Sequence, residues 1–202
     1  MRLICLDLEG VLVPEIWIAF AGAAGIPELE RTTRDEPDYD KLMRFRLDVL
    51  ARRGLRLADI RAVIAKMEPL PGAAAFARQV RDRAQLVILS DTFDQFAGPL
   101  MEKLERPCIF CNTLETGAAG EITGYRLRQS DGKRKAVEAF ASMGLKVFAA
   151  GDSHNDLTMI RAADAGCLFR APDSIAKANR DIPHANDYAE LLAMIDGFLA
   201  GG

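Results

Sequence analysis

Five short apolar runs, separated by segments with helical spacing, constrain the fold of this chain more than any other feature. The runs cover residues 3–6, 86–89, 108–111, 147–150 and 165–169. Runs of this length that end at polar or glycine residues are typical of strands buried in a parallel sheet. Strands that alternate with helices predict an α/β fold, in which a mainly parallel, doubly wound sheet carries helices on both faces. The 202 residues are enough for one such domain and a small insertion.

The insertion is expected directly after the first strand. Residues 15–68 have apolar positions at helical spacing and no strand signal, and the Pro-Leu-Pro-Gly sequence at 69–72 forms a turn that suits a hinge. We therefore predict a helical cap over residues 15–69 and a core domain made of residues 1–14 and 70–202. Three glycines between residues 116 and 124 also predict a small β-hairpin extension after the third run.

Polar side chains follow three of the predicted strands, and a lysine begins a later helix. They are Asp7, Glu9, Ser90, Asp91, Lys133, Asp152 and Asp156. Because the carboxyl ends of parallel strands share one edge of a sheet, we expect these side chains to converge there. Asp7 and Glu9 would also share one side if the first strand continued past Asp7. Buried carboxylates need a cation, a proton or hydrogen bonds, and Mg²⁺ suits several carboxylates, water and a phosphate oxygen.

The same edge suits a phosphate group. The Ser90 hydroxyl and backbone N–H groups at the start of a following helix can hold phosphate oxygens. Lys133 can neutralise the phosphate charge as a point cation. Read in isolation, Ser90 and Asp91 would instead suit a helix N-cap. Asp7 and Glu9, taken without the other motifs, would suit a turn at a strand end with solvated carboxylates.

The charge balance gives no reason to expect nucleic acid or an anionic membrane as a partner, since 26 Lys and Arg stand against 29 Asp and Glu. No apolar run approaches the length of a membrane span, and the N-terminus enters a strand rather than a secretion signal, so we expect a cytoplasmic protein. Cys5 and Cys167 are expected as buried thiols. Cys108 and Cys111 are expected as two thiols on one strand, not as a zinc or redox site.

Four motifs, in this order along the chain, resemble those of the haloacid-dehalogenase-like (HAD) phosphatase superfamily. They are residues 7–12 (Asp-Leu-Glu-Gly-Val-Leu), residues 90–92 (Ser-Asp-Thr), Lys133 and residues 151–156 (Gly-Asp-Ser-His-Asn-Asp). The first and fourth, each after a predicted strand, are the specific ones, and together the motifs span most of the chain. The resemblance implies a Rossmann-type HAD core with the helical cap above its site.

Further segments are similar to the phosphoserine phosphatases, and most of all to the bifunctional group that also transfers the phosphoryl group to homoserine. These segments are residues 8–17, 32–35, 37–40 and 88–93. Most HAD members carry a second Asp where this chain has Glu9, whereas the bifunctional group has Glu there. This departure therefore favours the bifunctional group.

The resemblance assigns the chemistry to the first and fourth motifs. Asp7 would be the nucleophile that forms an aspartyl-phosphate, and Glu9 would act first as general acid and then as general base. Mg²⁺ would be held by Asp7, the backbone carbonyl of Glu9 and Asp152. Asp156 would support that site from behind.

The resemblance also assigns substrate recognition. The residues expected to bind the substrate and its phosphate are Glu15, Met43, Arg46, Ser90, Asp91, Lys133 and Asn155. Glu15 would pair with the substrate ammonium, Arg46 would take its carboxylate, and Met43 would line the pocket. The expected substrate is O-phosphoserine, with water or homoserine as the acceptor.

Two other functions stay open at this point. Without Glu15 and Arg46 in the pocket, the chain would suit another small phosphometabolite, such as a sugar or nucleotide phosphate. A catalytically silent phosphate-binding module would have no need of Asp7. His154 is expected at the rim of the site, and neither a role for His184 nor an oligomeric state is assigned.

Overall fold

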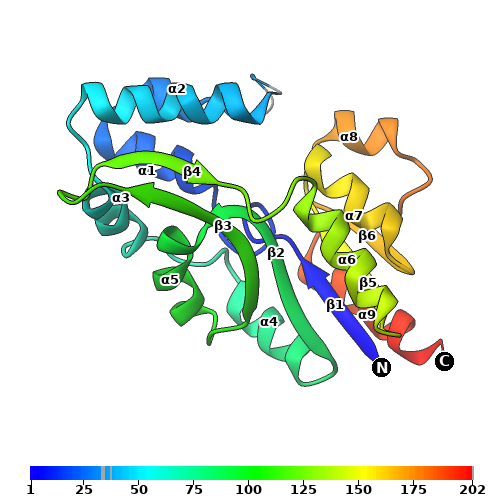
Figure 1. Cartoon of the computed structure of the whole chain (residues 1–202). Coiled ribbons are helices and arrows are strands. Elements are labelled where there is room, and N and C mark those ends of the chain that lie inside the picture. Colours follow the sequence, from blue (N-terminus) through cyan, green and yellow to red (C-terminus); the bar gives the residue numbers. More distant parts are fainter. Residues whose placement is uncertain (33–34, 37, 202) are drawn as a thin grey trace.

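A seven-stranded sheet, in the order β4-β3-β2-β1-β5-β6-β7, forms the centre of the molecule (Figure 1). The structure is a computed structural model that describes residues 1–32, 35–36 and 38–201. The strands are β1 (Arg2–Leu6), β2 (Gln85–Phe93), β3 (Cys108–Thr116), β4 (Ile122–Arg126), β5 (Lys146–Gly151), β6 (Ala165–Phe169) and β7 (His184–Ala185). β4 runs antiparallel to β3, and the other neighbouring strands are parallel. The predicted mainly parallel α/β sheet and its hairpin extension are thereby confirmed.

Helices cover both faces of the sheet, as predicted. One face packs against α4 (Ala73–Arg81), α5 (Asp94–Lys103) and α9 (Tyr188–Ala200), and the other against α6 (Gly132–Ser142) and α7 (Leu157–Ala162). The alternation of side chains along a strand explains the two layers. Ile4 and Leu6 of β1 enter the first core, whereas Leu3 and Cys5 enter the second.

A helical segment lies between β1 and α4, where the sequence predicts the cap. It contains α1 (Ile16–Ala24), a 3-10 helix (Pro27–Glu30), α2 (Tyr39–Arg52) and α3 (Leu57–Ile64). Asp38 begins α2 by accepting the N–H groups of Asp40 and Lys41, at 3.1 and 3.2 Å. The division into a cap of residues 15–69 and a core of residues 1–14 and 70–202 stays a prediction. Thr33, Arg34 and Pro37, which belong to the segments that carry the resemblance, lie outside the described residues.

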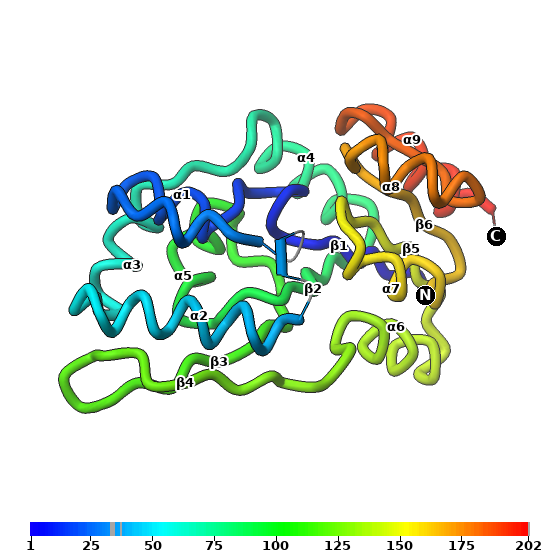
Figure 2. Tube along the Cα trace, turned by 90° about the horizontal axis from the view of Figure 1, so that it is seen from above, coloured from blue at the N-terminus to red at the C-terminus, as the bar shows by residue number. Residues whose placement is uncertain are grey.

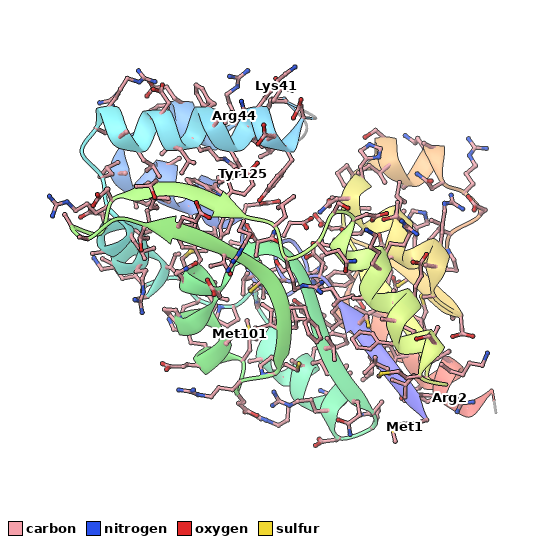
Figure 3. The ribbon with its side chains drawn as sticks, in the orientation of Figure 1. Met1, Arg2, Lys41, Arg44, Met101 and Tyr125 are labelled. Atoms are coloured by element: carbon pink, nitrogen blue, oxygen red, sulfur yellow. The ribbon has the colours of Figure 1, made fainter. Side chains whose placement is uncertain are left out.

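The β3–β4 hairpin lies along α2 (Figure 1, Figure 2). Tyr125 of β4 points toward α2 (Figure 3), where its hydroxyl donates to Asp40 Oδ1 at 2.6 Å. Backbone contacts continue this contact surface toward α3, since the Leu57 N–H donates to the Gly120 carbonyl at 3.0 Å. The hairpin therefore braces the helical segment above the sheet.

Two strands are longer than the apolar runs that predict them. β2 continues to Phe93 because Ser90–Thr92 stay extended although all three residues are polar, and its register against β3 shifts between Leu89 and Phe93. β3 continues to Thr116 because its second half pairs with β4. The helix α8 (Asp173–Ala178) and the strand β7 have no counterpart among the predicted elements, since both are too short to show a clear periodicity.

The thiols lie where the sequence predicts them. Cys5 and Cys167 are buried, whereas Cys108 is exposed and Cys111 half-buried on β3. None of the helices in the described part of the chain has both the length and the hydropathy that a membrane crossing requires.

Candidate active site

A cavity of about 900 Å³ opens at the carboxyl ends of the central strands and extends to the N-terminal halves of α1 and α2. Most of the predicted site residues line it: Asp7, Glu9, Glu15, Arg46, Ser90, Asp91, Lys133, Asp152 and Asn155. Residues at strand ends line the core side of the cavity, and residues of the helical segment line the opposite side. The fold therefore brings together residues that lie far apart in the sequence, as the strand-edge argument predicts.

Asp7 and Glu9 leave the first strand in different environments. β1 ends at Leu6, and the next residues form a tight turn in which the Leu12 and Val13 N–H groups both donate to the Leu8 carbonyl, at 2.8 and 3.0 Å. Asp7 Oδ1 accepts the Leu8 N–H at 2.7 Å and lies 2.9 Å from Lys133 Nζ. Glu9 Oε2 instead accepts the Ile16 N–H, at 2.8 Å, at the start of α1. The condition for a shared strand face, a strand that continues past Asp7, is not met.

Lys133 joins two of the buried carboxylates. Its Nζ lies 2.9 Å from Asp7 Oδ1 and 2.7 Å from Asp156 Oδ1, and the lysine is only 4% exposed. Burial alone would lower the pKa of Lys133, but the charges of Asp156, Asp7 and Asp91 outweigh this and hold that pKa well above its usual value. Lys133 therefore stays a cation in the wall of the cavity. Lys135, two residues further on α6, contacts Ser130 instead.

Asp156 lies behind the cavity wall and is fully buried. Its Oδ2 accepts the backbone N–H groups of Asp152 and Ser153, at 3.1 and 3.0 Å. Gly151 makes this possible, because a Cβ there would lie 2.2 Å from the Asp156 Cγ. Asp156 thus holds the loop that carries Asp152, and its role in supporting a metal site stays a prediction.

Gly10 gives Asp152 its place beside the first motif. A Cβ on Gly10 would lie 2.4 Å from Asp152 Oδ2, and the φ of Gly10 is +75°, which favours glycine. The glycine of the first motif therefore lets the loop after β1 approach the carboxylate that follows β5. We call Asp7, Lys133, Asp152 and Asp156 the acidic corner.

The acidic corner has the donor set that a divalent cation prefers. Oxygen atoms of Asp7, Asp152 and Asp156 all lie within 4.8 Å of one another, and all three residues are buried. Three carboxylates stand against one ammonium group, and carboxylate oxygens are the ligands that hard cations bind. Burial, followed by the charge of Asp156, raises the pKa of Asp7 despite the nearby Lys133. The residues present thus fit a divalent metal, and the predicted contribution of the Glu9 carbonyl stays a prediction.

Ser90 and Asp91 lie on the irregular part of β2, where the register against β3 shifts. Ser90 is buried and its Oγ accepts the Thr92 N–H at 3.2 Å. Asn155 Nδ2 donates to Asp91 Oδ2 at 2.7 Å, which links this strand to the fourth motif. The N-cap interpretation is wrong, because α5 begins at Asp94 and Phe93 is its N-cap residue. The shift in register carries the two polar residues to the cavity instead.

The opposite side of the cavity carries charges that are less closely paired. Loss of solvation raises the pKa of Glu9 to about 8, and the charge of Glu15 and a hydrogen bond between the two carboxyl groups act in the same direction. Glu15 lies directly before α1 and is half-buried. Burial lowers the pKa of Arg46 to about 10, although Tyr39, Glu9 and Glu15 oppose this shift. The charges of Glu9, Glu15 and Arg46 therefore interact where β1 and the helical segment meet, and they shift the pKa values of Glu9 and Arg46.

Arg46, and not its neighbour Arg44, faces the cavity. The exposed fraction is 6% for Arg46, whereas the Arg44 side chain is 77% exposed and points outward from α2 beside Lys41 (Figure 3). Met43 differs from its prediction, since it is fully buried and is absent from the cavity lining. Its sulfur lies 3.8 Å from Arg46 Nη1, so it packs behind the arginine. It is the helical spacing of three and four residues that places Tyr39, Met43 and Arg46 on one side of α2.

Two aromatic residues in the cavity wall were not among the predicted site residues. Trp17 lines the cavity, and its ring lies under the Arg46 guanidinium. The Tyr39 hydroxyl donates to the Asp91 carbonyl at 3.2 Å and so bridges α2 and β2. The helical spacing to Arg46 is a signal that could have identified Tyr39. His154 lies at the exposed end of the lining, as expected. We call Glu15, Trp17, Tyr39 and Arg46 the cap wall.

Comparisons with known proteins agree with this geometry. A family model described as haloacid dehalogenase-like hydrolase matches residues 5–161. "Phosphoserine phosphatase ThrH" of Pseudomonas aeruginosa is 51% identical over 191 residues, which cover 95% of this chain and 93% of that protein. A "phosphoserine phosphatase" of Pseudomonas syringae is also 51% identical, covering 95% of this chain and 81% of the relative.

Solved structures show the same fold. A structure described as a substrate-bound phosphoserine phosphatase complex has a TM-score of 0.79 and 23% sequence identity, and the match covers 96% of this chain and 97% of that one. The predicted resemblance to phosphoserine phosphatases is therefore confirmed in sequence and in fold. The chain belongs to the haloacid dehalogenase-like hydrolases.

Proposed function

We propose that the chain is a phosphoserine phosphatase that can also transfer the phosphoryl group from O-phosphoserine to homoserine. The observation that carries this proposal is the position of Arg46. Its guanidinium lines the same cavity as Asp7 and Lys133, and its buried Nε has no hydrogen-bond partner among the described residues. A phosphate monoester that also bears a carboxylate would satisfy both sides of this cavity. The names of the two Pseudomonas relatives support the same substrate.

The first half of the reaction uses Asp7 and Glu9. A carboxylate oxygen of Asp7 attacks phosphorus, an O–P bond forms, and the bond from phosphorus to the serine oxygen breaks. Glu9 donates its proton to the leaving serine oxygen. Glu9 suits this role because its pKa is raised to about 8, mainly by loss of solvation, so that the carboxyl group retains a proton at neutral pH.

The second half reverses the roles of these groups. Water or the hydroxyl of homoserine attacks the phosphorus of the aspartyl-phosphate, and Glu9 takes the proton of the attacking oxygen. Asp7 is regenerated, and the product is inorganic phosphate or O-phosphohomoserine. The longer side chain of Glu, compared with Asp, changes the reach of the acid by one methylene, which we infer leaves room for an acceptor larger than water.

Phosphate binding is assigned to the core side of the cavity. Lys133 neutralises phosphate charge from its position beside Asp7, and Ser90 Oγ and the Asp91 N–H bind phosphate oxygens. Asn155 is held against Asp91 and would reach the substrate or the acceptor. Arg46 and Glu15 of the cap wall would bind the carboxylate and the ammonium of the amino acid.

The metal is proposed to be Mg²⁺, held by Asp7, the Glu9 carbonyl and Asp152. When bound, it would screen the negative phosphate from the attacking carboxylate. The acidic corner fits it through the closely spaced, buried oxygen atoms of Asp7, Asp152 and Asp156. A cytoplasmic location also stays a prediction, which cell fractionation would test.

The experiment combines purified protein, Mg²⁺ and O-phosphoserine, with and without homoserine, and follows both free phosphate and O-phosphohomoserine. We expect O-phosphohomoserine to form at the expense of free phosphate. Free phosphate alone, unaffected by homoserine, would leave a phosphatase without the transfer activity. Activity on sugar or nucleotide phosphates without turnover of phosphoserine would contradict the amino-acid assignment of Glu15 and Arg46. A chelator is expected to abolish turnover and added Mg²⁺ to restore it.

A further inference from the structure

The cap holds the Arg46 guanidinium through three different contacts. Nη2 donates to the Arg31 carbonyl at 2.8 Å, Nη1 lies 3.8 Å from Met43 Sδ, and Cζ lies 4.5 Å from the centroid of the Trp17 ring. No carboxylate of the described residues forms an ion pair with it. Nε is buried and has no hydrogen-bond partner among the described residues. Whether that donor meets a ligand productively depends on how the guanidinium plane is oriented.

Trp17 is the contact that is placed to orient this plane, because its ring centroid lies 4.5 Å from Arg46 Cζ. A single hydrogen bond to the Arg31 carbonyl restrains one nitrogen but allows the guanidinium to turn about that bond. A flat ring against the face of the guanidinium opposes this rotation, because stacking and cation–π attraction both favour the face-on arrangement. A carboxylate is recognised along the N–H edge, in the guanidinium plane, so the orientation of the plane decides whether the edge is presented.

We propose that Trp17 is a positioning residue that sets the selectivity of the pocket for phosphate monoesters bearing a carboxylate, by holding Arg46 face-on. This inference rests on the proposed function. It gives Trp17 a role beyond core packing, and it separates that role from binding itself, which belongs to Arg46.

The indole ring is in turn held by the core. Phe96 of α5 contacts the Trp17 ring edge-on, with a centroid distance of 5.8 Å and an interplanar angle of 72°. The residue before Trp17, Ile16, donates its N–H to Glu9 Oε2 at 2.8 Å. Through Ile16 and Trp17, the first turn of α1 therefore contacts the proposed acid, a core helix and the arginine of the cap, so the indole ring is held relative to the core.

The test compares two substrates that differ in one group. O-phosphoserine and O-phosphoethanolamine share the phosphate and the amine, but only the first has a carboxylate. In W17L we expect KM for phosphoserine to rise about tenfold with little change in kcat, equivalent to about 1.4 kcal/mol. KM for phosphoethanolamine is expected to stay within about twofold of the wild-type value. W17F should retain part of the selectivity, because phenylalanine offers a weaker cation–π face than tryptophan.

A matched control comes from the same helix. Phe20 of α1 is also a large aromatic residue, is 1% exposed, and is absent from the cavity lining. F20L removes a comparable amount of buried ring without touching the guanidinium, so the ratio of the two kcat/KM values is expected to stay at the wild-type value. An equal loss for both substrates in W17L, or the same loss of selectivity in F20L, would show that Trp17 acts through packing alone and would overturn the proposal.

A double-mutant cycle tests whether Trp17 acts through Arg46. In an R46M background the substitution W17L is expected to cause no further loss of selectivity, because the group it positions is gone. An undiminished effect of W17L in R46M would contradict the proposal. If the wild-type protein does not prefer phosphoserine over phosphoethanolamine, it is the proposed function that fails.

Tryptophan fluorescence reports on the contact independently of turnover. Trp17 is the single tryptophan of the chain, so the intrinsic emission belongs to it. We expect R46M to change this emission and L-serine, but not ethanolamine, to change it in the wild-type protein. Emission that is identical in wild type and R46M, and insensitive to L-serine, would overturn the assignment whichever substrate the enzyme prefers.

Discussion

The acidic corner and the cap wall lie at the same cavity, but they differ in whether their buried cation is paired with carboxylates. In the acidic corner, Lys133 Nζ lies within 3 Å of both Asp7 and Asp156. In the cap wall, Arg46 is just as well buried but pairs with no carboxylate among the described residues and keeps an unused donor. The corner is stabilised by its own ion pairs before any ligand arrives, whereas the cap wall keeps a binding group that only a ligand satisfies.

The difference shows how such a site can combine fixed chemistry with selective recognition. Groups that act on phosphorus gain from being preorganised, because they then require no rearrangement during the reaction. A group that selects the substrate gains from being unsatisfied, because a buried donor without a partner costs about 1–3 kcal/mol until a ligand pairs with it. The two regions should therefore respond differently to substitution.

The largest effect is expected at the proposed nucleophile. D7N should lower kcat at least about 10⁴-fold, because the amide cannot form the aspartyl-phosphate. Acid-quenched reactions with radiolabelled phosphoserine should label the wild-type protein and leave D7N unlabelled. D48N, which changes an exposed carboxylate on α2, should behave like wild type. Substantial turnover or labelling in D7N would place the nucleophile elsewhere.

Next comes the lysine of the acidic corner. K133M leaves Asp7 and Asp156 without their cation, so we expect the free energy of unfolding to fall by about 3–5 kcal/mol and kcat by about 10²–10³-fold. Urea denaturation without added metal measures the first quantity, and steady-state kinetics the second. K135M, two residues further on α6, serves as the control. A K133M protein as stable as wild type would contradict the view that the corner is held by its own ion pairs.

Arg46 should give the opposite result for stability. In R46M we expect KM for phosphoserine to rise about 100-fold, because a charge-assisted contact is lost. The free energy of unfolding without substrate should stay unchanged or rise by about 1 kcal/mol, since a buried, unpaired guanidinium is replaced by an apolar side chain. R44M, on the outer face of α2, should change neither quantity. If R46M destabilised the protein as much as K133M, the contrast between the two regions would be lost.

The smallest effect is expected at the glycine beside Asp152. In G10A the new Cβ would lie 2.4 Å from Asp152 Oδ2 at a φ of +75°, so the loop or the carboxylate must move. We expect kcat/KM to fall about tenfold at limiting Mg²⁺ and the Mg²⁺ concentration for half-maximal activity to rise, as for other changes that disturb a metal ligand. G22A makes a matched control, since nothing lies within 4 Å of its added Cβ. An unchanged Mg²⁺ requirement in G10A would show that Asp152 tolerates displacement.

The sequence predicted the acidic corner well because each of its members is tied to the end of a strand or the start of a helix. Asp7 follows β1, Asp152 follows β5 and Lys133 opens α6, and parallel strands bring such ends to one edge whatever the details of packing. The glycines belong to the same local information, since Gly10 and Gly151 admit the two carboxylates that follow β5. The local sequence and the topology of the sheet were therefore sufficient to predict the position of the acidic corner.

The local sequence did not predict the conformation of the second half of β2. Polar residues interrupt the apolar pattern at Ser90, which favoured the end of a strand and an N-cap, yet the chain stays extended to Phe93. Pairing with β3 at Leu89 and again at Phe93 holds the backbone on both sides of this stretch, and such pairing depends on distant residues.

The sheet, the helical segment after β1 and the convergence of Asp7, Lys133 and Asp152 thus follow from the amino-acid sequence, because strand ends and motif glycines act locally. The arrangement of the cap wall depends instead on long-range packing. This packing turned Arg46 inward and Arg44 outward, moved Met43 behind the arginine, and brought Trp17 under a guanidinium from another helix. Helical periodicity restricts which residues share a face, but the face that meets the cavity is chosen by how α1, α2 and the β3–β4 hairpin pack together.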